Sequence, residues 1–149
     1  MPHVQQQHDG ECLAACVSMC LHCLKRAHTY RQIITLLGIQ ANIGAPFSNV
    51  RNLQQMNCPV VYRPYGALHE LHAFLADGWP CIASVQTSDL PYWNQINVYH
   101  VVVVTGMDPD YVYLNDPDLP FGPISVSMGD FDLAWLAQDE TYTVIGAQD

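Results

Sequence analysis

Two residues near the N-terminus are of types that support attack on a carbonyl group. Cys12 ends the polar run QQQHDGEC (residues 5–12), at the point where an apolar helical pattern begins. At a helix N-terminus the dipole and the free backbone N–H groups favour the thiolate, which is the nucleophilic form of cysteine. Gln6 lies six residues earlier, and its side-chain amide could donate to an oxyanion together with the backbone N–H of Cys12. The spacing is compatible with a cysteine nucleophile beside an oxyanion donor.

A base and its orienting acid are available in the second half of the chain. His100 alone of the seven histidines begins a strongly apolar strand, YHVVVVTG (99–106). An imidazole that enters a buried sheet needs a partner, because an unsatisfied polar group costs about 1–3 kcal/mol. Asp116 ends the next strand in YLNDP (113–117), and a hairpin that turns near Pro109 would bring it back beside His100. There Asp116 would fix the tautomer of the ring and stabilise the imidazolium.

Hydrophobic periodicity and turn residues predict the elements that position these groups. Thr29 to Gln32 form a capping-box pattern, and Gly38 is a typical stop for the helix that follows. Helices are expected over 12–23, 29–38, 48–56, 67–78 and 130–137, and strands over 59–63, 80–86, 99–107, 111–115, 124–126 and 141–146. Helices first and antiparallel strands afterwards indicate an α+β fold. We expect a single domain over residues 1–149, with an N-terminal helical half packed on a C-terminal antiparallel sheet.

The six cysteines leave several alternatives open for Cys12. They are Cys12, Cys16, Cys20, Cys23, Cys58 and Cys81. The first four share one predicted helix, where their spacing suits a buried face better than disulfide bridges, so reduced thiols are expected. A metal-binding module built from these four cysteines with His22 and His28 is an alternative. Compact zinc sites favour cysteine pairs across turns, whereas these cysteines are predicted within one helix. No metal and no other cofactor is therefore expected.

Composition and charge exclude several classes of protein. The chain has 149 residues, 50% of them hydrophobic and 13% charged, as globular domains do. It has no run of 18 apolar residues and no signal-peptide pattern, so we expect a cytoplasmic protein without membrane insertion. The net charge is −9 and all five cations precede residue 64. Such a chain repels phosphate backbones, which argues against a nucleic-acid partner and favours a neutral or basic peptide.

The order of the four candidate residues is that of papain-like peptidases. The segment QxxxxECxAACxxM (Gln6–Met19) resembles the start of the double-glycine, or bacteriocin-leader, peptidase domains of that clan. HVVVVTGMDPDYVYLNDP (100–117) is similar to their histidine strand and Asp-Pro hairpin. The resemblance implies a papain-like fold, with Cys12 as nucleophile, His100 as base, Asp116 as orienting acid and Gln6 in the oxyanion hole. It also implies a thiol peptidase with a peptide or protein substrate, and leader-peptide processing as its role.

Two features bear on the substrate site. Family members usually have glycine after the nucleophile, whereas this chain has Leu13, which could narrow the cleft beside the thiol. Tyr92 and Trp93 lie on the loop that precedes the histidine strand, where they could grip a substrate or pack against the core. Known members are often fused to a transporter, so this chain resembles a standalone relative or an isolated domain. The alternatives are a papain-like acyltransferase or deamidase and an inactive, peptidase-like binding domain. The sequence predicts no oligomeric state.

Overall fold

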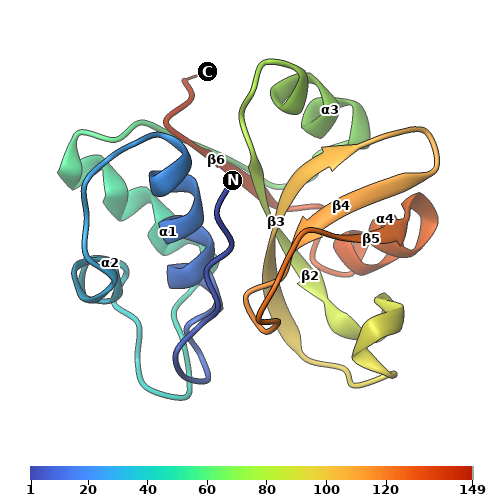
Figure 1. Ribbon diagram of the computed structural model, residues 1–149, viewed down its shortest axis with the longest axis horizontal. Helices are drawn as coiled ribbons and strands as arrows, with labels where there is room; N and C mark the ends of the chain where they lie inside the picture. Colours follow the sequence, from blue (N-terminus) through green and yellow to red (C-terminus); the bar gives the residue numbers. More distant parts are fainter. Residues whose placement is uncertain (149) are drawn as a thin grey trace.

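A six-stranded antiparallel sheet, covered by helices on both faces, forms the centre of the computed structural model, which describes residues 1–148 (Figure 1). The helices are α1 (Cys12–Cys23), α2 (Tyr30–Leu37), α3 (Leu68–Ala76) and α4 (Met128–Leu136), with the 3₁₀ segments η1 (Phe47–Met56), η2 (Thr87–Asp89) and η3 (Pro91–Trp93). The strands are β1 (Val60–Arg63), β2 (Cys81–Gln86), β3 (Tyr99–Met107), β4 (Tyr111–Asn115), β5 (Ile124–Ser127) and β6 (Tyr142–Ile145). Their order in the sheet is β1-β6-β2-β3-β4-β5. The predicted α+β class is therefore confirmed.

The continuous apolar run of β3 reflects burial on both faces of the sheet. Val101 and Val103 belong to the core shared with α1, α2 and η1. Val102 and Val104 belong to a second core on the opposite face, which includes residues of α3 and α4. Because successive side chains of a strand point to opposite faces, a strand between two helical layers needs apolar side chains at successive positions, which the valines provide. The sequence predicted the N-terminal helical layer on one face of the sheet. It did not predict that α3 and α4 cover the opposite face.

Helix α1 is buried nearly all round, because it lies between the sheet and the segments α2 and η1 (Figure 1). Every residue from Leu13 to Leu21 is buried. The predicted buried face extended to Cys23, and there the prediction is wrong, because Cys23 is exposed at the last turn of the helix. All six cysteines are free thiols.

The β3–β4 hairpin turns where the sequence predicted. Asp108 builds the turn, since its Oδ1 accepts from the backbone N–H groups of Asp110 and Tyr111 at 2.9 and 2.8 Å. The register pairs Val103 with Asn115, which is the last residue of β4. The next residue, Asp116, therefore lies one step beyond this pair toward the start of β3, from where its carboxylate reaches the His100 ring.

The other predicted elements also occur, with small changes. Helix α2 has both hydrogen bonds of the Thr29–Gln32 capping box, and Gly38 ends it with a left-handed φ of 68°. The helix expected over 48–56 is a 3₁₀ segment, η1, and the loop before β3 contains two short 3₁₀ turns. Within residues 1–148, none of the helices is long and apolar enough to span a membrane.

Removing the N-terminal cap of α2 tests this account of its start. We expect Thr29→Ala to lower the free energy of unfolding by about 1 kcal/mol, because the backbone N–H of Gln32 loses its acceptor. Urea unfolding measures the change. Thr35→Ala is the matched control, since Thr35 is exposed on the same helix, and its effect should stay within about 0.5 kcal/mol. Equal losses in the two variants would contradict the capping role.

Candidate active site

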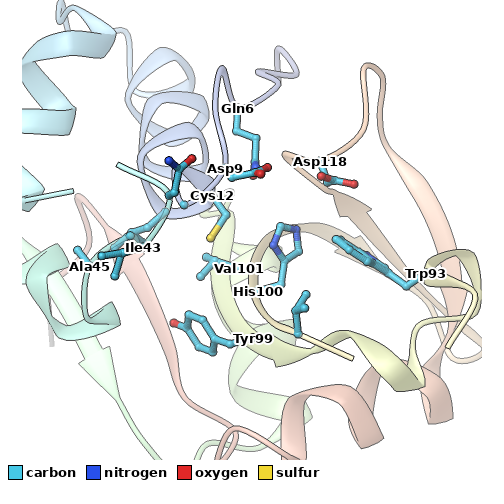
Figure 2. Close-up of a pocket in the computed structure, with 15 residues that line it drawn as sticks. Gln6, Asp9, Cys12, Ile43, Ala45, Trp93, Tyr99, His100, Val101 and Asp118 are labelled. Atoms are coloured by element: carbon cyan, nitrogen blue, oxygen red, sulfur yellow. The ribbon is translucent and has the colours of Figure 1, made fainter. Parts of the chain in front are cut away.

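A pocket of about 410 Å³ opens where the N-terminus of α1 meets the start of β3 (Figure 2). Three of the four residues predicted to carry the chemistry line it, namely Gln6, Cys12 and His100. Asp116 lies behind His100 and is completely buried. The structure therefore brings together four residues that are up to 110 positions apart in the chain.

Cys12 is the first residue of α1 and is partly exposed to the pocket. Its sulfur points toward the His100 ring (Figure 2). Among the described residues no side chain caps α1, so its first backbone N–H groups have no partner from a cap. They and the positive end of the helix dipole favour negative charge at this place. Burial raises the pKa of the thiols of Cys16, Cys20, Cys58 and Cys81, which keeps those four cysteines protonated.

His100 and Asp116 form a buried ion pair. Nε2 of His100 donates to Oδ1 of Asp116 at 2.6 Å, and the exposed fractions of the two residues are 4% and 0%. Burial alone would lower the pKa of His100, but hydrogen bonds and charge interactions with Asp116 and Cys12 outweigh it and raise this pKa from 6.5 to about 9. Because Nε2 is bound to Asp116, Nδ1 is the ring nitrogen left for Cys12. The ring is therefore held as an imidazolium at neutral pH, beside the thiol.

The Asp116 carboxylate receives four hydrogen bonds. Oδ1 accepts from His100 and from the backbone N–H of Asp118, the latter at 2.8 Å. Oδ2 accepts from Oη of Tyr92 at 2.5 Å and from Nε1 of Trp93 at 3.0 Å. Burial alone would raise the pKa of Asp116, but the hydrogen bond and charge of His100, with the hydrogen bonds from Tyr92 and the Asp118 backbone, lower it below its ordinary 3.8. The carboxylate is therefore ionised throughout the neutral range.

Tyr92 and Trp93 lie differently from each other. Tyr92 directs its hydroxyl to Asp116 and is not among the residues that line the pocket. Trp93 does line the pocket, and its ring meets that of His100 edge to face with centroids 5.0 Å apart. The sequence placed both residues near the cleft, but it could not show that their polar groups meet the Asp116 carboxylate.

Gln6 reaches the pocket on an N-terminal arm that is bound to the loop after β4. Its backbone N–H donates to the carbonyl of Pro117 at 2.8 Å, and the ring of His3 contacts the carbonyl of Leu119 at 2.6 Å. The side-chain Nε2 of Gln6 donates to the carbonyl of His8 at 3.4 Å, while its Oε1 is buried without a partner. One N–H of this amide remains for another acceptor.

Leu13 presents little surface to the pocket that it lines. Its exposed fraction is 2%, and it packs into the core beneath α1. The opposite wall comes from the segment 42–45, which the sequence did not single out. This wall touches the turn before α1, since a Cβ at Gly10, where φ is +86°, would lie 2.9 Å from the backbone nitrogen of Gly44. Segment 42–45 is therefore held in backbone contact with the turn that precedes Cys12.

The remaining lining residues divide the pocket into an acidic and an apolar side. Asp9 and Asp118 lie near Gln6, whereas Ile43 and Tyr99 lie on the other side of Cys12 (Figure 2). Ile43 is 78% exposed at the rim of the pocket. No group of three or more His, Cys, Asp or Glu side chains among residues 1–148 is arranged to hold a metal ion.

Three solved structures with the same fold are described as peptidases or peptidase domains. A chain from Bacillus anthracis described as a C39-like peptidase has a TM-score of 0.80 at 13% identity, over 99% of this chain and 95% of that one. A double-glycine motif protease from an AMS/PCAT transporter, in complex with the leader peptide, has a TM-score of 0.75 at 22% identity, over 99% and 91%. The peptidase domain of Streptococcus ComA, a bi-functional ABC transporter of a quorum-sensing pathway, has a TM-score of 0.74 at 15% identity, over 98% of each chain.

The family assignment comes from the sequence itself. None of the curated proteins matches the chain. The model of the family described as Peptidase_C39 like matches residues 1–142, which include the pocket and the Asp116 loop. The chain therefore belongs to the Peptidase_C39 like family, as its resemblance to the double-glycine peptidases implied.

Proposed function

We propose that this protein is a thiol peptidase that cleaves a peptide bond through an acyl-enzyme on Cys12. The observation that carries the proposal is the line of contacts from Cys12 to His100 to Asp116 at the uncapped end of α1. Membership of a peptidase family and the likeness to a protease in complex with a leader peptide support it. We further propose leader-bearing peptides as its substrates.

Each of the four residues has a separate role in the proposed mechanism. The Cys12 thiolate attacks the peptide carbonyl carbon, and the resulting oxyanion accepts from the backbone N–H of Cys12 and from Nε2 of Gln6. The His100 imidazolium gives its Nδ1 proton to the leaving amine, so the C–N bond breaks and a thioester remains. Neutral His100 then takes a proton from water, which attacks the thioester and releases the acid and the thiolate. Asp116 stays ionised and holds the ring in place.

A direct assay tests this function. A synthetic leader peptide should be cut by the wild type, and Cys12→Ala should abolish cleavage, because no other group in the pocket can form the thioester. Cys23→Ala is the matched control, since Cys23 is exposed at the other end of the same helix and should leave the rate unchanged. Mass spectrometry of the products identifies the bond cut.

The same assay separates the alternatives. Cleavage that persists in Cys12→Ala would contradict the proposal. A product carrying an added amine, in place of a free acid, would indicate the acyltransferase reaction. Binding of the peptide without any cleavage by the wild type would favour the inactive, peptidase-like binding domain.

The lining of the pocket predicts a preference for uncharged or basic substrates. Asp9 and Asp118 are exposed on one side of the thiol, while Ile43 and Tyr99 offer an apolar surface on the other. In peptides that differ at one position, Lys opposite the acidic side should be favoured over Glu by about two- to fivefold in kcat/KM, as for exposed charge pairs. Asp118→Asn should reduce this ratio, and added salt should reduce it in the wild type. A ratio unaffected by either change would exclude these carboxylates as the cause.

Stability should depend on pH through the buried ion pair. The pKa of His100 is raised from 6.5 to about 9, so its stabilising contribution is complete below pH 6.5 and is lost as pH rises through about 9. The total loss is on the order of 3 kcal/mol. The pKa of Asp116 is lowered from 3.8, so its contribution is present above pH 3.8 and is lost as pH falls further.

Urea unfolding at a series of pH values measures this dependence. Asp116→Asn is the comparison, because it removes the hydrogen bond and the charge of Asp116 that raise the pKa of His100, so the loss of stability between pH 6.5 and 9 should become smaller. Taking the difference between the two proteins cancels the titration of exposed groups that they share. Equal slopes would show that the ion pair does not stabilise the fold.

A further inference from the structure

The segment η3, next to the active site, presents two hydrogen-bond donors to the residue behind the base. From the placement of Tyr92 and Trp93, we propose that both are positioning residues, which hold the Asp116 carboxylate against His100 and thereby keep the imidazolium in place beside Cys12. This inference rests on the proposed function. It gives these aromatic residues a role other than the substrate grip that the sequence suggested.

The geometry of the carboxylate is complete only with these two donors. An ionised carboxylate has about four acceptor sites, and the four donors to Asp116 fill them. Two donors bind Oδ1, namely Nε2 of His100 at 2.6 Å and the backbone N–H of Asp118 at 2.8 Å. Oδ2 depends on Oη of Tyr92 and Nε1 of Trp93 alone, at 2.5 and 3.0 Å. If both were lost, one oxygen of a fully buried anion would have no partner.

The loop that carries the two aromatic residues is closed at its base by hydrogen bonds between its two ends. Buried Thr87 accepts from the backbone N–H of Val98 at 2.9 Å and donates from its hydroxyl to the carbonyl of Ile96 at 2.7 Å. Leu90, completely buried, anchors the middle of the loop in the core beside α4. The segment is therefore a fixed support for Asp116, unlike a mobile flap that closes over a substrate.

Trp93 also acts on the base through its ring. The edge-to-face contact with His100, at 5.0 Å between centroids, packs Trp93 against the imidazole on the side away from Cys12 (Figure 2). The Nε1–H of Trp93 thus holds Asp116, while its ring holds His100. Trp93→Phe removes the N–H but retains an aromatic ring against His100, so it isolates the hydrogen bond from the packing.

The expected effect follows from what holds Asp116 ionised. The titratable groups that face Asp116 are His100 from β3, Tyr92 from η3, Asp118 from its own loop and Cys16 from α1. Of these, His100 and Tyr92 favour the anion, while burial opposes it. With a donor removed, Asp116 takes up a proton at a higher pH. The imidazolium then loses its counter-charge, and the thiolate beside it loses its partner.

The test measures how fast iodoacetamide alkylates Cys12 as a function of pH, with the labelled residue identified by peptide mapping. For wild type we expect Cys12 to be labelled much faster than exposed Cys23, because the His100 imidazolium lies beside its sulfur. In Tyr92→Phe and in Trp93→Phe the acid limb, the part of the rate–pH curve where the labelling rate falls with falling pH, should move to higher pH by about one unit. The labelling rate of Cys12 near pH 5.5 should then be roughly tenfold slower than in the wild type. Above pH 9 all rates should agree, because the thiolate then forms without the imidazolium. The double variant should shift further than either single variant.

Controls distinguish a positioning role from a structural one. Tyr111→Phe makes the same change at an exposed tyrosine on β4 and should reproduce the wild-type profile. Thermal unfolding of each variant reports its stability, and a loss of stability without a shift of the acid limb would overturn the proposal. Acid limbs of the Tyr92 and Trp93 variants that superpose on that of the wild type would overturn it as well.

The same measurements separate this inference from the proposed function. If Cys12 of the wild type titrates like exposed Cys23 and is labelled no faster, the nucleophile itself is wrong. If Cys12 has a distinct acid limb in the wild type that the variants retain, only the role of Tyr92 and Trp93 is wrong.

Discussion

The arrangement of the site depends on one buried anion, the carboxylate of Asp116. A charge with no exposed surface is tolerated in a protein only when it is paired and fully hydrogen-bonded. Here the partners come from three separate parts of the chain: His100 on β3, the pair Tyr92 and Trp93 on η3, and the backbone of the loop after β4. The requirement to satisfy this one group draws those parts into a single geometry. The ion pair with His100 is thus a structural constraint as well as a chemical one.

The loop after β4 connects the two functions of the pocket. Asp116, at its start, holds the base, while the carbonyl of Pro117 holds the backbone of Gln6, the proposed oxyanion donor. The carbonyls of Asp118 and Leu119 hold further residues of the same N-terminal arm. A displacement of this loop would move the base and the oxyanion donor together. The relative position of the proton donor and the oxyanion donor is therefore maintained by four consecutive residues.

Much of the fold and part of the site could be predicted from the sequence, for identifiable reasons. The valines of β3, the capping box at Thr29 and the Asp-Pro turn at Asp108 act through neighbours in sequence, so their patterns are readable. Candidate roles for Cys12 and His100 followed from their places at the start of a helix and of a strand. The donation from Tyr92 to Asp116 joins residues 24 positions apart, and local pattern does not encode such a contact. The burial of Leu13 depends on the path of α1 through the core.

The start of α1 shows how function constrains local stability. A helix usually begins with a side chain that accepts from its first N–H groups, and a serine or aspartate at position 11 would do so. Glu11 occupies this position without capping the helix, because its carboxylate instead accepts from the backbone N–H of His8 and from the hydroxyl of Tyr30, at 3.1 and 3.0 Å. A capping oxygen would occupy N–H groups of the first turn, beside which the thiolate and the oxyanion of the proposed reaction must be stabilised. The stabilisation of about 1 kcal/mol that a cap would provide is thus absent at the one helix end where the proposed chemistry needs free N–H groups. Burial of Leu13 to Leu21 between the sheet and the helical layer compensates for it.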